Sequence, residues 1–318
     1  ARIRPHFAAW SEALLSSFAA SAAFSRAAAD CAARAARMAL DAPPKKRAVQ
    51  KPVRGLRVAV LASGSKGNAA YIELDGTRIL IDAGVSARRI TRSLRDLGVD
   101  PADLDGVFIT HEHSDHIKGL STLLKEYRLP LFARPATLRA IKESIAVPED
   151  TFSPLAGDVM LGSVSVKSFA TLHDAAAPVG YTVCGSEKCA LATDLGFLTE
   201  DVMAAIEGAD ALILEANHDR DLLQRGSYPW RLKQRILSNR GHLSNSAAAW
   251  ALVRLKKRPS AVFLAHISQE NNRPDLVEET VQTILHQQNV RQGNILLTAQ
   301  DVPTLWGFAD EIAAKENL

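Results

Sequence analysis

Short apolar runs that end in polar residues recur along this chain from about residue 55 onward. They lie at 56–61, 69–74, 77–84, 106–110, 131–133, 164–169, 179–183, 190–196, 211–218 and 261–266. Runs of this length, bounded by turn residues, predict buried strands. The Gly- and Ser-rich loop 62–68 leads into another strand and not into a helix, which excludes a P-loop or a dinucleotide-binding start.

Helical patterns alternate with these strands in the first half of the fold. Apolar residues have helical spacing in 88–97, 120–127 and 136–144, and 246–253 is a further predicted helix. Alternating strands and helices predict an α/β fold in which helices cover an outer face of a sheet.

Composition separates residues 1–54 from the rest of the 318-residue chain. The first 54 residues are rich in Ala, Arg and Ser and hold 10 Lys/Arg against 3 Asp/Glu, which leaves 28 against 32 for residues 55–318. We therefore expect one folded domain over 55–318. Residues 1–54 would be an N-terminal extension or linker, with a targeting peptide, an Ala-rich helix and a segment outside the fold all left open.

The main body is mildly acidic, so overall charge gives no argument for nucleic-acid binding. There is no apolar run long enough to span a bilayer, and no membrane partner is expected. Three cysteines are too few for a disulfide framework, which favours a reducing compartment: the cytoplasm, or an organelle if residues 1–54 are a transit peptide. The oligomeric state stays open, with a homodimer as one option.

The segment 111–116, His-Glu-His-Ser-Asp-His, directly follows the strand 106–110. Residues two apart in an extended segment share a face, so His111 and His113 are expected to bind one ion together. Asp115 and His116 follow where the chain starts to turn, and are expected to serve a neighbouring position. The alternative is a solvated His-rich turn, which does not explain the alternating spacing or the partners at distant strand ends.

Other polar residues repeat this placement at later strand ends. His173 follows one strand and is expected to be the third imidazole of the first metal, while Asp194 ends another as a bridging carboxylate. Asp82 ends an earlier strand, where it can support a metal ligand, cap the next helix, or do both. Seven of the nine histidines lie at such junctions, which predicts a shared rim of a sheet-based fold.

These motifs resemble, in order, the metal motifs of the metallo-β-lactamase superfamily. The segments 61–68, 215–219 and 241–245 resemble more closely the YycJ/WalJ group of bacterial metallohydrolases, regarded as DNA exonucleases and related to ribonuclease Z. The resemblance covers about residues 55–315. It implies an α/β fold of the αββα sandwich type, with two mixed sheets and a dimetal site at the sheet edges, in a hydrolase domain.

The resemblance also implies the ligand sets. His111, His113 and His173 would hold the first metal, and Asp115, His116 and His266 the second, with Asp194 shared. The cofactors would be two divalent ions, zinc, manganese or iron, that activate a shared water as the nucleophile. Having His113 where an oxygen-reducing diiron branch has Glu favours hydrolysis. The residues expected to act in catalysis are Asp115, Asp194 and His242.

Substrate choice depends on two other segments. His242 lies just before the helix 246–253, which Ser244 or Asn245 can cap, so His242 would contact a phosphate or belong to the cap alone. Residues 220–240 carry six Lys/Arg with Tyr228 and Trp230, which suits a phosphodiester backbone, although Arg231 and Arg235 also fit a solvated helix face. The candidate substrate-binding residues are His218, Ser244, Asn245, Arg225, Tyr228 and Arg231.

Together these features predict a dimetal phosphodiesterase, a nuclease that acts on DNA in preference to RNA. A 5′-to-3′ exonuclease direction follows from the resemblance alone. Two alternatives stay open: a small-molecule ester or thioester hydrolase of the same fold, which predicts a closed pocket, and a non-catalytic nucleic-acid-binding or regulatory protein.

Overall fold

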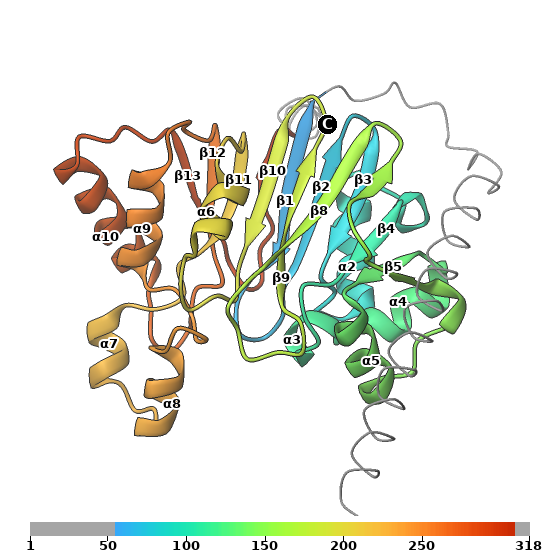
Figure 1. Ribbon diagram of the computed structural model, residues 1–318, viewed down its shortest axis with the longest axis horizontal. Coiled ribbons are helices and arrows are strands. Elements are labelled where there is room, and N and C mark those ends of the chain that lie inside the picture. The colour runs from blue at the N-terminus through green and yellow to red at the C-terminus, as the bar shows by residue number, and fades with distance from the viewer. Residues whose placement is uncertain (1–54, 309–318) are drawn as a thin grey trace, which may run out of the picture.

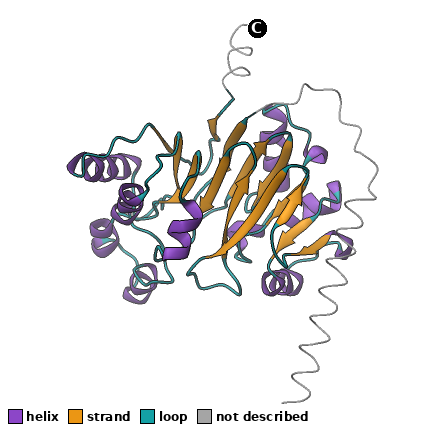
Figure 2. Ribbon diagram, turned by 45° about the horizontal axis from the view of Figure 1, so that its top comes forward, coloured by secondary structure: helices purple, strands orange, loops and turns teal. Residues whose placement is uncertain are grey.

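Two facing β-sheets with helices on their outer sides form the core of the protein, as seen in a computed structural model that describes residues 55–308 (Figures 1 and 2). The expected N-terminal extension, residues 1–54, lies outside the described residues, as do residues 309–318. The two-sheet architecture with helices on both sides confirms the predicted sandwich of two mixed sheets.

The first sheet has seven strands in the order β14-β1-β2-β3-β4-β5-β6. Strands β14, β1, β2 and β3 pair antiparallel, and β3 to β6 pair parallel. Their bounds are β1 Leu56–Ala62, β2 Ala69–Leu74, β3 Thr77–Ile81, β4 Gly106–Phe108, β5 Leu131–Ala133, β6 Phe152–Pro154 and β14 Thr304–Trp306.

The second sheet also has seven strands, in the order β13-β12-β11-β10-β9-β8-β7. Strands β8 to β10 pair antiparallel and β10 to β13 parallel, so β8 to β13 repeat the pairing pattern of β1 to β6. Their bounds are β7 Val159–Leu161, β8 Val164–Ala170, β9 Val179–Cys184, β10 Lys188–Ala192, β11 Ala211–Glu215, β12 Ala261–Ala265 and β13 Asn294–Leu297.

Helices α2, α4 and α5 cover the outer face of the first sheet, and α6, α9 and α10 that of the second (Figure 1). Helix α3 lies below the sheets, and α7 and α8 lie at the lower left of the view, below α9 (Figure 1). The bounds are α2 Ala87–Asp96, α3 Ser114–Ile117, α4 Leu120–Tyr127, α5 Pro135–Ser144, α6 Glu200–Ile206, α7 Arg220–Arg225, α8 Trp230–Ile236, α9 Asn245–Arg254 and α10 Pro274–Gln287, with 3-10 turns at Pro101–Asp103 and Glu149–Thr151. No described helix has the length and apolar character needed to cross a membrane.

Aromatic side chains join the two sheets in the central core. Phe108 at the end of β4 stacks on Phe132 at 4.6 Å and meets Tyr181 of β9 edge to face at 5.6 Å. The buried Tyr181 hydroxyl donates to the Ile109 carbonyl at 2.7 Å, which satisfies its polar end. This contact fixes the backbone directly before His111.

Several predicted strands end earlier than expected. The predicted segments 77–84, 190–196 and 211–218 end at Ile81, Ala192 and Glu215. Asp82 and Asp194, just beyond two of these ends, have φ angles of 63° and 56°, a left-handed conformation that leaves the strand. The polar residues at these ends therefore lie in turns.

Candidate metal centre

The loop after β4 brings four ligand-competent side chains to the edge of the first sheet. His111 and His113 are extended, and α3 then carries Asp115 and His116. Backbone bonds hold the loop in place: Asn68 N donates to Asp115 O at 2.8 Å and Ala83 N to His116 O at 2.7 Å. The chain approaches so closely here that a Cβ on Gly84 would lie 1.6 Å from Asp115 O.

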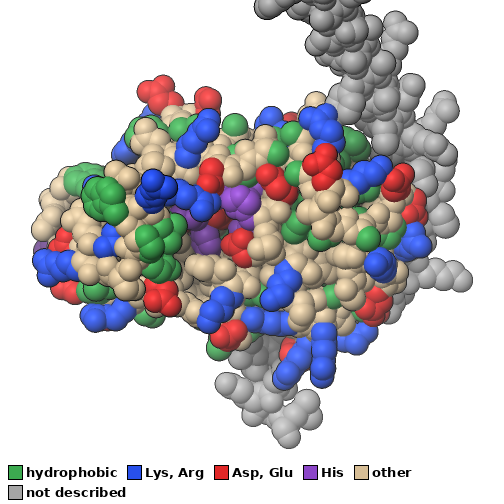
Figure 3. Space-filling view, turned by 90° about the horizontal axis from the view of Figure 1, so that it is seen from below, with side chains coloured by type: hydrophobic (Ala, Val, Ile, Leu, Met, Phe, Trp, Pro, Cys, Tyr) green, Lys and Arg blue, Asp and Glu red, His purple; other side chains and the backbone are tan. Residues whose placement is uncertain are grey.

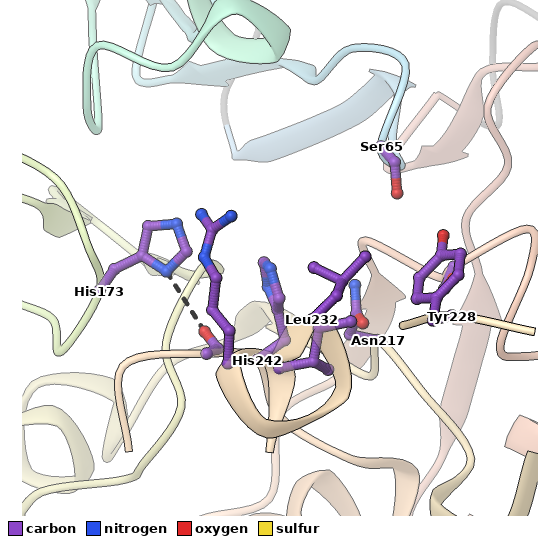
Figure 4. Close-up of a pocket in the computed structure, with 10 residues that line it drawn as sticks. Ser65, His173, Asn217, Tyr228, Leu232 and His242 are labelled. Atoms are coloured by element: carbon purple, nitrogen blue, oxygen red, sulfur yellow. Dashed lines mark hydrogen bonds between the residues drawn. The ribbon is translucent and has the colours of Figure 1, made fainter. Parts of the chain in front are cut away.

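The first ligand group consists of His111, His113 and His173. One ring nitrogen from each lies within 4.8 Å of the others. His173 comes from the loop after β8, and its Nδ1 lies 3.2 Å from the Gly241 carbonyl (Figure 4). The structure therefore brings together the three imidazoles expected for one ion, from segments about sixty residues apart.

The second ligand group consists of Asp115, His116 and His266, again with ligand atoms within 4.8 Å of one another. Asp115 Oδ2 lies 3.4 Å from His116 Nε2 and 3.9 Å from His266 Nε2. Asp194 lies between the two groups, because its carboxylate is 3.4 Å from His116 Nε2 and 3.9 Å from His173 Nε2. This is the place that a shared carboxylate would occupy.

Buried polar atoms without a hydrogen-bond partner test whether this site fits metal ions. His111 Nε2, His266 Nε2 and Asp194 Oδ2 are such atoms among the described residues. Leaving them unsatisfied is costly in a protein interior. Imidazole nitrogens and carboxylate oxygens converging at this spacing are a donor set that suits borderline divalent cations, so the residues fit the implied ions.

Asp82 supports His116 from behind. Its Oδ2 lies 2.8 Å from His116 Nδ1, while Thr110 donates to the same carboxylate through its backbone N–H at 2.8 Å and its hydroxyl. These contacts direct His116 Nε2 toward Asp115 and Asp194. The alternative role of Asp82 as a helix cap is wrong, because Ser86 caps α2 by accepting from Arg89 N.

The carboxylates set the protonation of the buried histidines. Although burial alone would lower the pKa of His116, Asp82 and Asp194 raise it well above its ordinary value. His266 behaves alike: burial opposes the charge, but Asp194 and Glu215 raise its pKa to about 9. Burial and the neighbouring imidazoles lower the pKa of His111.

Glu215, to which the sequence analysis gave no role, is the most connected carboxylate of the site. It is fully buried, and its Oε1 accepts from His242 Nδ1 at 2.7 Å and His266 Nδ1 at 2.9 Å. Its Oε2 accepts from the backbone N–H groups of Leu195 and Leu243, both at 3.1 Å. Burial would raise the pKa of Glu215, but the two histidines lower it below its ordinary value. The sequence did offer one indication of this role, because Glu215 directly follows the apolar run 211–214.

A cavity of about 170 Å³ opens beside these groups (Figure 4). Seen from below, histidines lie in a hollow of the surface with Lys/Arg and Asp/Glu side chains around it (Figure 3). His173 and His242 line the cavity with eight other residues, namely Ser65, Asn217, Tyr228, Leu232, Arg235, Ile236, Gly241 and Ser268. His242 thus faces solvent-accessible space next to the candidate ligand groups.

Of the six candidate substrate-binding residues, Tyr228 is the one that lines this cavity. Arg225 and Arg231 are exposed on α7 and α8 and do not line it. The other three are buried and structurally engaged. The backbone of His218 forms an isolated β-bridge with that of Ser244. The Ser244 hydroxyl caps α9 by accepting from Ala247 N, and the side-chain amides of Asn245 and Asn272 donate to each other.

Comparison with known proteins adds the family context. The profile of the β-lactamase superfamily domain matches residues 77–267. Exodeoxyribonuclease WalJ of Streptococcus pneumoniae is 39% identical over 246 residues, which cover 75% of this chain and 91% of that protein. Exodeoxyribonuclease YycJ of Bacillus anthracis is 38% identical over 244 residues, covering 75% and 92%. The metallo-β-lactamase fold protein YhfI from Bacillus subtilis has a similar fold, with a TM-score of 0.61 at 16% identity over 79% of this chain and 99% of that one.

Proposed function

Because this chain belongs to the β-lactamase superfamily, in the family of the WalJ and YycJ exodeoxyribonucleases, we propose that it is a two-metal phosphodiesterase that shortens DNA from the 5′ end. That it is a metal-dependent nuclease follows from the family. The number of ions, the preference for DNA over RNA and the polarity are part of the proposal.

The observation that carries the proposal is the convergence of the two ligand groups around Asp194. His111, His113 and His173 lie on one side of it, and the second ligand group on the other. Two divalent ions bound there would supply a nucleophile from water at neutral pH and offset the charge of a phosphoryl group. Their identity, zinc, manganese or iron, depends on availability as well as on the donor set.

The residues of this chain would do the rest of the work. Asp194 would be shared between the two ligand groups, because its carboxylate lies 3.4 Å from His116 Nε2 and 3.9 Å from His173 Nε2. Glu215 accepts a hydrogen bond from His242 Nδ1 and thereby orients the ring. The Nε2 atom of His242 would then protonate the leaving oxygen of a substrate in the cavity. Sequence analysis expected Asp115 to act in catalysis. In this proposal its part is to bind an ion as a member of the second ligand group.

The cavity bears on the alternative of a small-molecule ester or thioester hydrolase. That activity predicts a closed pocket, and pockets that enclose drug-sized ligands measure roughly 300–1,000 Å³. Here the cavity measures about 170 Å³ and lies in a surface hollow. Space for part of one nucleotide, open to the surface, suits the end of a polymer better. A non-catalytic role is less well supported, because relatives 38–39% identical are named exodeoxyribonucleases.

The test is cleavage of 5′-labelled and 3′-labelled DNA and RNA by metal-free protein reloaded separately with manganese, zinc and magnesium. We expect stepwise loss of nucleotides from DNA, starting at the 5′ end, and little cleavage of RNA. Asp194→Ala should abolish the activity. Arg92→Ala is the matched control, because Arg92 is an exposed residue of α2 paired with Asp96.

Metal content must be measured on the same samples. No cleavage of either nucleic acid, with both metal positions filled, would overturn the proposal and direct the search to small esters and thioesters. Cleavage that starts at the 3′ end, or that prefers RNA, would keep the nuclease but correct its polarity or its substrate.

A further inference from the structure

Arg235, near the end of α8, is the one Lys or Arg side chain among the residues that line the cavity within the described chain. The basic residues Arg225 and Arg231 lie on α7 and α8, are exposed and do not line the cavity. Sequence analysis counted Arg235 among the basic residues of segment 220–240, with a solvated helix face as the alternative. Its position on the cavity wall, with His173 and His242, gives it a different chemical setting.

The backbone of Arg235 is held rigidly against the His242 segment. His242 N donates to Ile236 O at 3.0 Å, and a Cβ on Gly241 would lie 2.4 Å from Arg235 O, so no side chain fits between the two segments. Gly241 O in turn lies 3.2 Å from His173 Nδ1. The end of α8 is therefore fixed relative to the first ligand group.

The guanidinium of Arg235 is paired with a single carboxylate. Arg235 Nη2 lies 2.6 Å from Asp174 Oδ2, and the other Asp174 oxygen lies 3.4 Å from His173 Nε2. The arginine side chain is 56% exposed and the aspartate side chain 35%. An ion pair this exposed contributes little, and one nitrogen uses only part of the five N–H donors of a guanidinium. Replacing Asp174 by another anion as the partner of the guanidinium therefore costs little free energy.

The anion that fits is a phosphate diester. Arginine binds phosphate oxygens through two parallel N–H donors, and Tyr228 and Leu232 offer apolar surface beside it for the attached nucleotide. On the basis of the proposed function, we propose that Arg235 leaves Asp174 and binds a non-bridging oxygen of the substrate phosphate next to the metal site. In the free protein Asp174 is the anion that competes for the guanidinium.

The test compares Arg235→Ala, Arg235→Lys, Asp174→Asn and the control Arg92→Ala on a 5′-phosphorylated single-stranded DNA of defined length. Loss of a charge-assisted contact predicts a roughly 10- to 100-fold fall in kcat/KM for Arg235→Ala. Arg235→Lys should fall in between, because it keeps the charge but loses the fork. Asp174→Asn should stay within about 3-fold of wild type, since only the competing anion is removed.

Salt dependence gives a readout that a purely structural role would not move. Each phosphate contact on a single strand contributes about −0.7 to the slope of log affinity against log salt concentration. Arg235→Ala should therefore make the slope of log kcat/KM shallower by about that amount, while Asp174→Asn and Arg92→Ala keep the wild-type slope.

The outcomes separate this inference from the function on which it rests. If wild-type protein cleaves DNA and Arg235→Ala has wild-type kcat/KM and salt slope, the inference alone is wrong. Equal losses in Arg235→Ala and Asp174→Asn, with unchanged slopes, would show that the ion pair only holds α8 to the His173 loop, and would also overturn it. If the wild-type chain with filled metal positions cleaves no nucleic acid, both proposals fail together.

Discussion

Two buried carboxylates, Asp82 and Glu215, each hold an imidazole by its Nδ1 atom and leave Nε2 facing the site. Neighbours of this kind fix the tautomer and the orientation of a metal-binding histidine. His218, by contrast, is buried with its Nδ1 atom unpaired among the described residues. Protonation of His218 would place a charge in the protein interior, so it would lower the stability of the fold.

His218 makes the stability of the protein sensitive to acid. Its side chain is buried, and burial lowers its pKa to about 4. Because the unfolded residue titrates near 6.5, the unfolded state binds more protons between these pH values, and the free energy of unfolding falls as the pH drops. We expect a loss of about 3 kcal/mol from this residue by pH 4. Denaturant unfolding of the chelated protein at several pH values measures it.

The comparison variant is His218→Asn, whose unfolding free energy should vary less with pH in that window. His286→Asn, an exposed position on α10, should follow wild type. Identical pH dependence in wild type and His218→Asn would show that the pKa of His218 is not lowered.

At this scale the sequence predicted residues that follow strands, and missed residues whose role depends on distant contacts. His111, His173 and Asp194 each close or follow an apolar run, and the structure places them together. Glu215 also closes such a run, but its partners His242 and His266 lie on separate segments. No local sequence pattern predicts that these three segments meet at one carboxylate.

Helix α9 illustrates what one capping residue contributes at the scale of an element. Its N-cap, Ser244, is buried and accepts a hydrogen bond from Ala247 N at 3.2 Å, and the helix packs against the second sheet. The same residue was a candidate for binding substrate. The structure engages its hydroxyl in the cap.

Replacing Ser244 by Ala should lower the free energy of unfolding by about 0.5–2 kcal/mol, because one N-terminal amide of α9 loses its acceptor. Ser244→Thr keeps a hydroxyl and should retain most of that stability. Denaturant unfolding and nuclease assays on both variants check this. Unchanged stability together with lost cleavage in Ser244→Ala would restore the substrate-binding role.

Helices and strands were predictable where one face is buried and the segment is long enough for its apolar residues to repeat. Strands β2 and β5 and helix α4 match their predicted bounds residue for residue. Strands β6, β7, β13 and β14 were missed, because three or four partly exposed residues carry too little pattern. Helices α7 and α8, of six and seven residues, were seen only as a basic segment. Helices α6 and α10 were also missed, although the buried Val277, Val281 and Leu285 of α10 recur every fourth residue.

For the whole molecule, metal ions should act as part of the fold. The proposed ligands lie in the segments that follow β4, β8, β10 and β12 across both sheets, so an ion that binds only the native state would stabilise the entire domain. A free ion concentration 100 times Kd adds about 2.7 kcal/mol per site. For a domain of this size that corresponds to a rise in Tm of at least about 5 °C.

Thermal unfolding with and without a chelator, followed by reloading with zinc or manganese, measures this effect. Asp194→Ala should respond much less to either ion, and Arg92→Ala should respond like wild type. The same Tm in chelated and reloaded wild type would mean that the ligand groups do not hold ions in the native state.

At this scale the sequence predicted more than at the others. The strand-end residues predicted a shared rim of a sheet-based fold, and the resemblance to the metallo-β-lactamase superfamily implied a two-sheet sandwich. The structure confirms that architecture. The pairing of β14 with β1 could not be predicted, because it joins segments at opposite ends of the domain and each has only a few residues to show it.

That pairing bears on how the chain folds as it is made. Strand β1, residues 56–62, is available early, but its outer edge is covered by Thr304–Trp306. At synthesis rates of about 5–20 residues per second, the edge stays open on the order of ten to fifty seconds. His266 leaves the ribosome before that strand, so the ligands are all present before the first sheet is closed. A nascent chain stalled between these points would contain every proposed ligand and an unprotected strand edge, the kind of edge through which chains associate.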